Sequence, residues 1–267
     1  MTWAARRFKL LAALAAGVVA VAESAPADAR PISTDSLVLA GSAQRLPDGT
    51  LRLASASRGH VVGVAWTPRR VFVRNGFTAE FTFRIQRGPS PPCDGFAFVV
   101  QNSARGERAM GADGGELGYG QDPGDGTPSL AGGPGIANSV AVEFDPCPNQ
   151  ASQFGRPDSV ADPKAPHVSI HTRGRARNSA DEQFSLGRTT AIPKITDGEA
   201  FSVRIVYRPG VLRIAVEPKV VLRVPLRLGR TLSLPDGRAW LGFTAANGDF
   251  TESDDILSFA VSRGKPI

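Results

Sequence analysis

A short stretch of the chain concentrates side chains that bind metal ions. Glu143 and Asp145 lie two positions apart in an apolar run that is typical of a strand, so both carboxylates leave the same face about 6.5 to 7 Å apart. On a buried strand they repel each other unless a cation lies between them. Asn149, Asp162 and His167 add an amide oxygen, a third carboxylate and an imidazole. Oxygen ligands suit calcium and an imidazole suits manganese or a similar metal, so the spacing predicts a metal site, with room for two adjacent ions sharing Asp145 and Asp162.

The segments that must position these side chains have the period of β-strands. Apolar residues alternate with other residues in several runs, separated by clusters of Gly and Pro, and no sustained helical periodicity is present. The runs are Phe77 to Ile85, Phe96 to Val100, Phe201 to Tyr207 and Leu212 to Val216. Many strands in one domain of this length predict an all-β, antiparallel β-sandwich.

The N-terminus has the composition of a secretory signal. A basic segment precedes an apolar run over residues 10–22, which is too short to span a bilayer, and Ala27 and Ala29 offer a small-x-small cleavage site. We expect a signal peptide over residues 1–29 and a mature domain over 30–267, the alternative being a buried N-terminal helix. No later apolar run is long enough for a membrane span. The expected location is therefore secreted or periplasmic, without stable membrane insertion.

The charge distribution argues against nucleic acid as a partner. The formal net charge of the 267 residues is +6, and the one dense basic cluster is Arg173, Arg175 and Arg177. No aromatic residues interleave with that cluster, as they would on a surface that stacks bases. We expect no nucleic-acid binding.

Residues 140–167 resemble the metal-binding loop of the legume-type (L-type) lectins, whose pattern is Glu-x-Asp-x-aromatic-x-Asn followed by Asp-Pro-x-x-x-His. Other segments resemble the family's sugar-site strand, glycine loop and C-terminal strands. These are Asp94-Gly-Phe-Ala-Phe98, Gly114-Gly-Glu-Leu-Gly118, Leu241-Gly-Phe-Thr-Ala-Ala-Asn-Gly248 and Asp255-Ile-Leu-Ser-Phe259. The resemblance covers residues 32–262. It implies a concanavalin A-like jelly roll and a non-catalytic lectin that binds glycans.

The resemblance also implies the roles of the metal ligands. Asp145 and Asp162 resemble the carboxylates that bridge both ions. Glu143 and His167 match the other ligands of a second divalent ion, Mn²⁺ or a similar metal. Asn149 and the backbone carbonyl of Cys147 match the other ligands of Ca²⁺.

The implied sugar site combines acceptors with donors. Asp94 accepts hydrogen bonds from sugar hydroxyls, Asn149 donates, and a backbone N–H of Gly114 or Gly115 donates where a side chain would block approach. The loop that contains Gly248 and Asp249 lies where the family reads sugar stereochemistry. The family also implies a cis peptide bond between Cys93 and Asp94.

Cys147 stands where the family usually has an aromatic residue that stacks on the sugar. Tyr119 or Phe250 could replace that ring, although packing or loop roles fit both residues better. Because the family places the neighbours of Cys147 and Cys93 at one sugar, we predict a Cys93–Cys147 disulfide, with two free thiols as the alternative.

Two histidines stand outside these roles. His171 follows His167 on the same strand face, either supporting the metal site or, as we favour, as an ordinary strand histidine. His60 has no partner that the sequence identifies.

Two other functions compete with that of a lectin. Glycoside hydrolases of related architecture carry Glu-x-Asp-x-x-Glu on one strand, whereas this chain has Pro148 in place of the second Glu, which argues against an enzyme. An adhesion module that has lost sugar binding is the other alternative. The sequence leaves the oligomeric state open, a homo-oligomer included.

Overall fold

The computed structural model describes residues 32–89, 93–122, 129–147 and 162–263. The predicted signal peptide over residues 1–29 and the predicted ligand Asn149 lie outside these residues. No helix among the described residues is long and apolar enough to cross a membrane.

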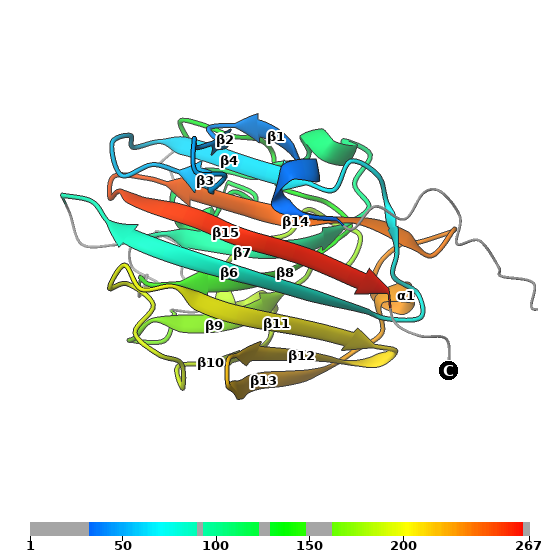
Figure 1. Ribbon diagram of the computed structural model, residues 1–267. Helices are drawn as coiled ribbons and strands as arrows, with labels where there is room; N and C mark the ends of the chain where they lie inside the picture. The colour runs from blue at the N-terminus through cyan, green and yellow to red at the C-terminus, as the bar shows by residue number, and fades with distance from the viewer. Residues whose placement is uncertain (1–31, 90–92, 123–128, 148–161, 264–267) are drawn as a thin grey trace, which may run out of the picture. The chain divides into compact units, whose positions relative to one another are not determined.

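Two antiparallel sheets face each other (Figure 1), which confirms the predicted β-sandwich. The eight-stranded sheet has the order β1 (Val38–Gly41), β4 (Val61–Trp66), β14 (Arg238–Asn247), β7 (Gly95–Gln101), β8 (Ser139–Asp145), β9 (His167–His171) and β10 (Ser185–Thr189), and β5 (Val71–Phe72) pairs with β14. The seven-stranded sheet has the order β13 (Lys219–Leu226), β12 (Gly210–Val216), β11 (Phe201–Arg208), β6 (Phe77–Arg87), β15 (Glu252–Arg263), β3 (Leu51–Ala54) and β2 (Gln44–Arg45).

The helical segments are short connections between strands. The 3-10 turns are η1 (Thr34–Ser36), η2 (Gly106–Arg108), η3 (Gly114–Glu116) and η5 (Glu182–Phe184), and the α-helix is α1 (Leu228–Thr231). The expectation of a chain without sustained helices is therefore confirmed for the described residues.

Aromatic rings join the two sheets. Phe81 on β6 lies with its ring centroid 5.1 Å from that of Phe243 on β14, 5.8 Å from that of Phe144 on β8 and 6.0 Å from that of Phe98 on β7. Phe81 and Phe98 come from the alternating runs of the sequence, and Phe144 and Phe243 share their core, because every second side chain of a strand points to one face. Packing between the sheets thus determines which side chains of β7, β8 and β14 point to the outward face of the eight-stranded sheet.

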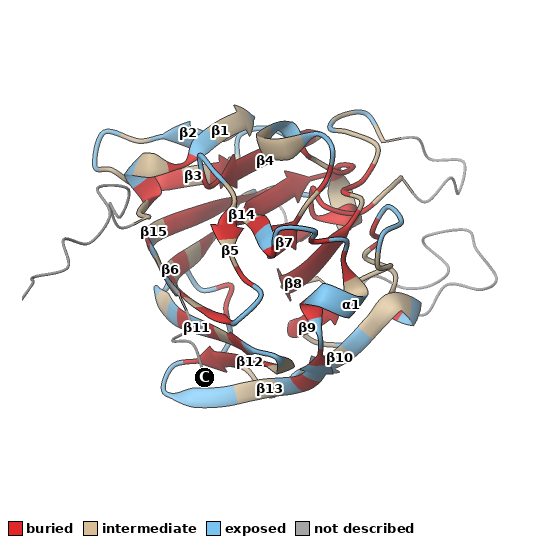
Figure 2. Ribbon diagram, turned by 90° about the vertical axis from the view of Figure 1, so that its right-hand side faces the viewer, coloured by how far each residue is buried: buried red, intermediate tan, exposed pale blue. Residues whose placement is uncertain are grey.

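The outward face of the eight-stranded sheet is also covered. A second apolar cluster, which includes Leu117, Tyr119 and Ile136 from the segments between β7 and β8, packs on Ala97 and Ala141 of that face. Figure 2 shows the result: the central strands are buried, whereas the edge strands β10 and β13 carry exposed residues. Polar side chains on the covered face of β8 and β9 are therefore shielded from water.

The two cysteines form the predicted disulfide. Strands β7 and β8 pair with Phe96 opposite Phe144, and the same register continued outward places Cys93 opposite Cys147. The Cα atoms of the two cysteines are 4.7 Å apart, within the range that a disulfide bridges. The bond links the segment before β7 to the segment after β8.

Removing this disulfide should destabilise the fold through the unfolded state. The bond closes a loop with a sequence separation of 54, for which the chain-entropy model gives about 4 kcal/mol. The double variant Cys93→Ala/Cys147→Ala should lose stability of that order in urea unfolding. Wild-type protein unfolded with a reductant is the control and should match the variant. An unchanged unfolding midpoint in both samples would contradict the prediction.

Candidate functional site

Strand register brings the predicted metal ligands of β8 and β9 together. Asp145 pairs with His167, Glu143 pairs with Ser169, and His171 lies opposite Ala141. Glu143 therefore sits between two imidazoles on the covered face of the sheet. Its Oε1 is 3.0 Å from Nε2 of His171 and 3.5 Å from Nε2 of His167.

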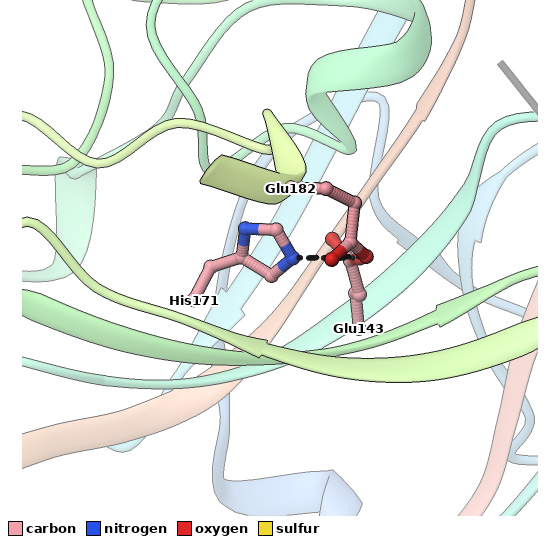
Figure 3. A group of neighbouring side chains, drawn as sticks. All are labelled: Glu143, His171 and Glu182. Atoms are coloured by element: carbon pink, nitrogen blue, oxygen red, sulfur yellow. Dashed lines mark ion pairs between the residues drawn. The ribbon is translucent and has the colours of Figure 1, made fainter. Parts of the chain in front are cut away.

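A further carboxylate, absent from the predicted set, joins this cluster. Glu182 lies on η5, just before β10, and its Oε1 is 3.5 Å from Nε2 of His167 and 3.7 Å from Nε2 of His171. Its other oxygen, Oε2, accepts a hydrogen bond from Nη1 of Arg188 at 2.8 Å. Figure 3 shows the imidazole of His171 pointing at the carboxylates of Glu143 and Glu182.

Tyr119 supports the cluster rather than stacking on a sugar. It is fully buried, and its hydroxyl donates to Oε2 of Glu143 at 2.7 Å. Burial and the negative charge of Glu143 raise the pKa of the Tyr119 hydroxyl, which keeps it a donor. The packing role that the sequence favours for Tyr119 is confirmed, because its ring is buried in the apolar cluster on the outward face of the sheet.

The pKa values show how strongly these groups depend on each other. Burial alone would raise the pKa of Glu143, but the positive charges of His171 and His167 lower it to about 2. Burial would lower the pKa values of the imidazoles, yet the carboxylates of Glu143 and Glu182 raise them to about 11 for His167 and about 10 for His171. Asp145 differs, because burial raises its pKa and the charges of Asp162 and Glu143 add to that shift. In the absence of a cation, protons on the two imidazoles and on Asp145 therefore reduce the negative charge of the cluster.

The donor atoms fit a divalent cation. Ligand atoms of Glu143, Asp145 and His167 lie within 4.8 Å of one another, as do those of Asp162, His167 and Glu182. Nε2 of His167 and Oε1 of Glu182 are buried without a hydrogen-bond partner in the described part of the chain. Glu143, Asp145, Asp162 and His167 are thus brought together as predicted. The backbone N–H of Cys147 donates to Oδ1 of Asp145 at 2.5 Å, which places Cys147 next to them.

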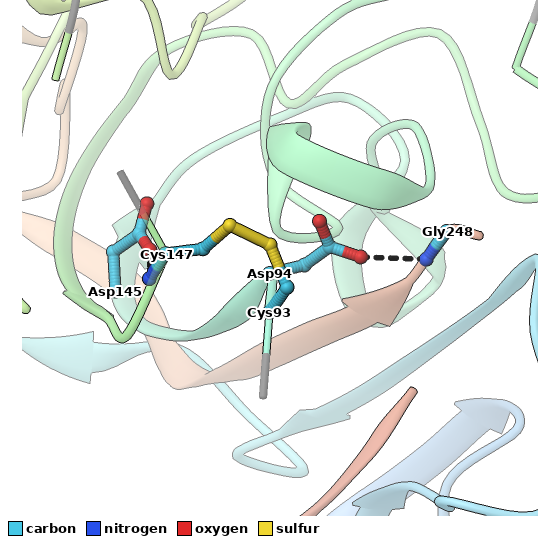
Figure 4. The surroundings of a disulfide bond; sticks show 5 residues. All are labelled: Cys93, Asp94, Asp145, Cys147 and Gly248. Carbon is cyan, nitrogen blue, oxygen red and sulfur yellow. Dashed lines mark hydrogen bonds between the residues drawn. A yellow bond between two sulfur atoms is a disulfide. The ribbon is translucent and has the colours of Figure 1, made fainter. Parts of the chain in front are cut away.

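Apart from Asn149, which lies outside the described residues, the predicted sugar-site residues meet at the same end of the sheet. Asp94, just before β7, is buried, and its Oδ2 accepts a hydrogen bond from the backbone N–H of Gly248 at 2.6 Å (Figure 4). A Cβ atom on Gly248 would lie 3.0 Å from the Cα atom of Gly114, so these two loops touch. Gly115 lies in the same η3 turn as Gly114. Burial raises the pKa of Asp94 to about 7.

His60 holds the two sugar-site loops together. Its Nδ1 is 3.1 Å from Oδ2 of Asp113, which precedes the glycine loop, and its Nε2 is 3.2 Å from Oδ1 of Asp249. The backbone N–H of His60 also donates to the carbonyl of Gly248 at 3.3 Å. The sequence identified no partner for His60, and the structure shows that its partners are the carboxylates of Asp113 and Asp249.

Two expectations are wrong. The Cys93–Asp94 bond is not cis, because the cis peptide bond among the described residues is Glu217–Pro218. Asp94 instead turns its carboxylate inward through a positive φ of 101°, followed by Gly95 at 100°. His171 is not an ordinary strand histidine, since it contacts Glu143 and lies beside Glu182.

Phe250 is 45% exposed at the loop that contains Asp249, so its ring is available to solvent.

Solved structures of similar fold include lectins. Peanut lectin with a nine-residue peptide superposes with a TM-score of 0.65 at 21% identity, covering 87% of this chain and 97% of that one. The lectin from Bauhinia forficata in complex with GalNAc gives 0.64 at 21% identity, covering 88% and 100%. The exoplasmic/lumenal domain of VIP36 in its Ca²⁺/mannose-bound form gives 0.61 at 16% identity, covering 87% and 84%. No curated protein sequence matches the chain.

The legume lectin domain family matches residues 31–266, which is nearly the whole chain and includes both halves of the site. Together with the sandwich and the lectin structures that it resembles, this match points to a carbohydrate-binding protein rather than to an enzyme. The chain belongs to the legume lectin domain family.

Proposed function

We propose that the protein is a secreted, metal-dependent lectin whose glycan site is formed by Asp94, the glycine loop and the loop after β14. The observation that carries the proposal is the meeting of the Asp94 carboxylate with Gly248 and Gly114, next to the metal-ligand cluster. Secretion is inferred from the predicted signal peptide over residues 1–29. The lectin structures that bind GalNAc or mannose support a glycan as the ligand.

The residues of the chain would bind a sugar through complementary hydrogen bonds. A pyranose hydroxyl both donates and accepts, and an ionised carboxylate has about four lone-pair sites, of which Gly248 uses one. Asp94 accepts from sugar hydroxyls. A backbone N–H of Gly114 or Gly115 and the amide of Asn149 donate to them. Gly114 and Gly248 leave space because neither carries a side chain.

The proposed ions serve to hold the loop. Ca²⁺ would be held by Asp145, Asp162, Asn149 and the carbonyl of Cys147, and a second divalent ion by Glu143, Asp145, Asp162 and His167. Their charge would replace the protons that Asp145 otherwise retains. The disulfide between Cys147 and Cys93 connects this loop to the residue that precedes Asp94 (Figure 4). The VIP36 structure in a Ca²⁺-bound form supports a divalent ion in this fold.

Replacing Asp94 should abolish glycan binding without unfolding the protein. Asp94→Asn keeps the shape of the side chain but loses the charge, and hydrogen bonds to charged groups contribute about 1.5 to 3 kcal/mol each. Two such bonds correspond to at least about a 100-fold loss of affinity. Binding on a glycan array, with Asp35→Asn as an exposed control, measures the effect. Unchanged glycan binding by folded Asp94→Asn protein would falsify the site.

Removing the ions should both destabilise the protein and abolish glycan binding. At a free metal concentration 1,000 times Kd, binding stabilises a fold by about 4 kcal/mol. Chelation should therefore lower the melting temperature, and added Ca²⁺ with Mn²⁺ should restore it. Asp145→Asn should behave like chelated protein and should not respond to added metal, because this carboxylate serves both proposed ions. A chelator that changes neither melting nor binding rules out metal dependence.

The raised pKa of Asp94 should make metal-free stability depend on pH. The carboxyl keeps its proton up to about pH 7 in the folded state but loses it near 3.8 when unfolded, so the folded state binds more protons between these values. The free energy of unfolding must then fall as pH rises through this window, by at most about 1.4 kcal/mol per pH unit.

The Asp94→Asn variant lacks this titration and serves as the matched control. Urea unfolding of both proteins in chelator at pH 5 and pH 6.5 gives their difference in stability. The wild type should lose stability relative to the variant at the higher pH. A difference that does not change between the two pH values would show that the Asp94 pKa is not raised.

A further inference from the structure

We propose that the second, non-calcium ion is bound by Glu143, Glu182, His167 and His171, so that Glu182 and His171 take the places given above to Asp145 and Asp162. This site has two imidazoles and suits zinc better than manganese. The inference rests on the proposed function only in requiring that a second divalent ion binds. It is independent of glycan recognition.

The separations between donor atoms carry the proposal. Each of the two imidazole Nε2 atoms lies between 3.0 and 3.7 Å from Oε1 of Glu143 and from Oε1 of Glu182. A tetrahedral Zn²⁺ holds nitrogen and oxygen ligands about 2.0 to 2.2 Å away, which puts neighbouring ligand atoms about 3.4 Å apart. The four measured separations bracket that value.

Each carboxylate is oriented by a contact to its other oxygen. Oε2 of Glu143 accepts from the hydroxyl of Tyr119 at 2.7 Å, and Oε2 of Glu182 accepts from Arg188 at 2.8 Å. The Oε1 atoms are thereby aimed at the imidazoles. Partners that fix a ligand's orientation in this way are characteristic of built metal sites.

Burial and missing hydrogen bonds provide independent support. The side chains of Glu143, Glu182, His167 and His171 are at most 1% exposed. Oε1 of Glu182 and Nε2 of His167 have no hydrogen-bond partner among the residues that the structure describes. These two atoms lie 3.5 Å from each other, at ion-pair distance but without a hydrogen bond, and a bound cation would satisfy both.

Another arrangement uses the same residues without an ion. Two protonated imidazoles would pair with the two carboxylates, and Nε2 of His171 also lies 2.9 Å from Oγ of Ser169. Oγ of Ser169 has a second partner in Oγ of Ser185 at 2.8 Å, so it remains hydrogen-bonded if Nε2 binds a metal. In that arrangement no ion contacts either imidazole, whereas the proposed site places both imidazoles on the ion.

The ligand set decides the preferred metal. Manganese favours carboxylate, carbonyl and water oxygens, whereas imidazole suits zinc. A site in which His167 is the single imidazole resembles a manganese site. Replacing Asp145 and Asp162 in the ligand set by the carboxylate of Glu182 and the imidazole of His171 shifts the preference toward zinc and leaves Asp145 and Asp162 to Ca²⁺.

X-ray absorption of the zinc-loaded protein tests the proposal. The mature chain is stripped with a chelator and reloaded with Ca²⁺ and one equivalent of Zn²⁺, and the number of imidazoles around zinc is counted. Two imidazoles are expected in the wild type and one in His171→Gln. One imidazole in the wild type would overturn the proposal, even if the variant fails to fold.

Competition between Zn²⁺ and Mn²⁺ gives a second readout. In His171→Gln the affinity for Zn²⁺ should fall at least about 10-fold more than the affinity for Mn²⁺. Asp35→Asn, which changes an exposed carboxylate outside the cluster, should leave both affinities unchanged. Equal loss of both metals in His171→Gln would mean that His171 only supports the fold. If no second ion binds at all, the inference and that part of the proposed function fail together, whereas glycan binding with Ca²⁺ alone is scored separately.

Discussion

The burial of negative charge at one end of the eight-stranded sheet is the constraint on which the site depends. Glu143, Asp145 and Glu182 are almost completely shielded from water. A buried carboxylate without a partner costs several kcal/mol, so the surrounding elements must compensate it. Strand β9 contributes the two imidazoles. Arg188 on β10 pairs with Glu182, which lies at the start of η5. The covering loop contributes the hydroxyl of Tyr119. The arrangement of these elements can be understood as the means of keeping those carboxylates inside.

Apolar packing decides where these charges point. On β8 the side chains of Val142 and Phe144 enter the core between the sheets, whereas Glu143 and Asp145 face the covering loop. Because successive side chains alternate, a slip of one residue would put the carboxylates into the aromatic core. The contact between Phe81 and Phe144 across the sandwich therefore holds the register that faces Asp145 with His167. The chemistry of the site is a consequence of a hydrophobic fit on the other side of the same strand.

Local patterns in the sequence predicted what depends on strand geometry. The alternation of β6 and β11, the shared face of Glu143 and Asp145, and the Cys93–Cys147 disulfide are all present. The roles of Glu182, Tyr119 and His60 were not predictable, because each depends on how a loop folds over the sheet. Glu182 lies on a 3-10 turn eleven residues after His171, and no regular strand or helix spacing relates the two positions. The cis peptide bond implied by the family was wrong for a similar reason, since the backbone of Asp94 reaches its place through a positive φ.

The surroundings of Glu143 and Asp94 shift the pKa values of these two carboxyl groups in opposite directions. The imidazoles around Glu143 overcome the effect of burial and lower its pKa to about 2, so that this charge is compensated within the chain. Asp94 is equally shielded, but one backbone N–H from Gly248 and the nearby His60 do not offset burial and the charges of Asp113 and Asp249. Its pKa rises to about 7, which leaves the anion undercompensated. Hydroxyl donors stabilise such a carboxylate more than one that is already paired, because they provide hydrogen bonds that the fold itself does not provide. The charge of Glu143 is therefore compensated within the chain, whereas those of Asp94 and Asp145 are not, and Asp94 is the carboxylate that we propose meets the ligand.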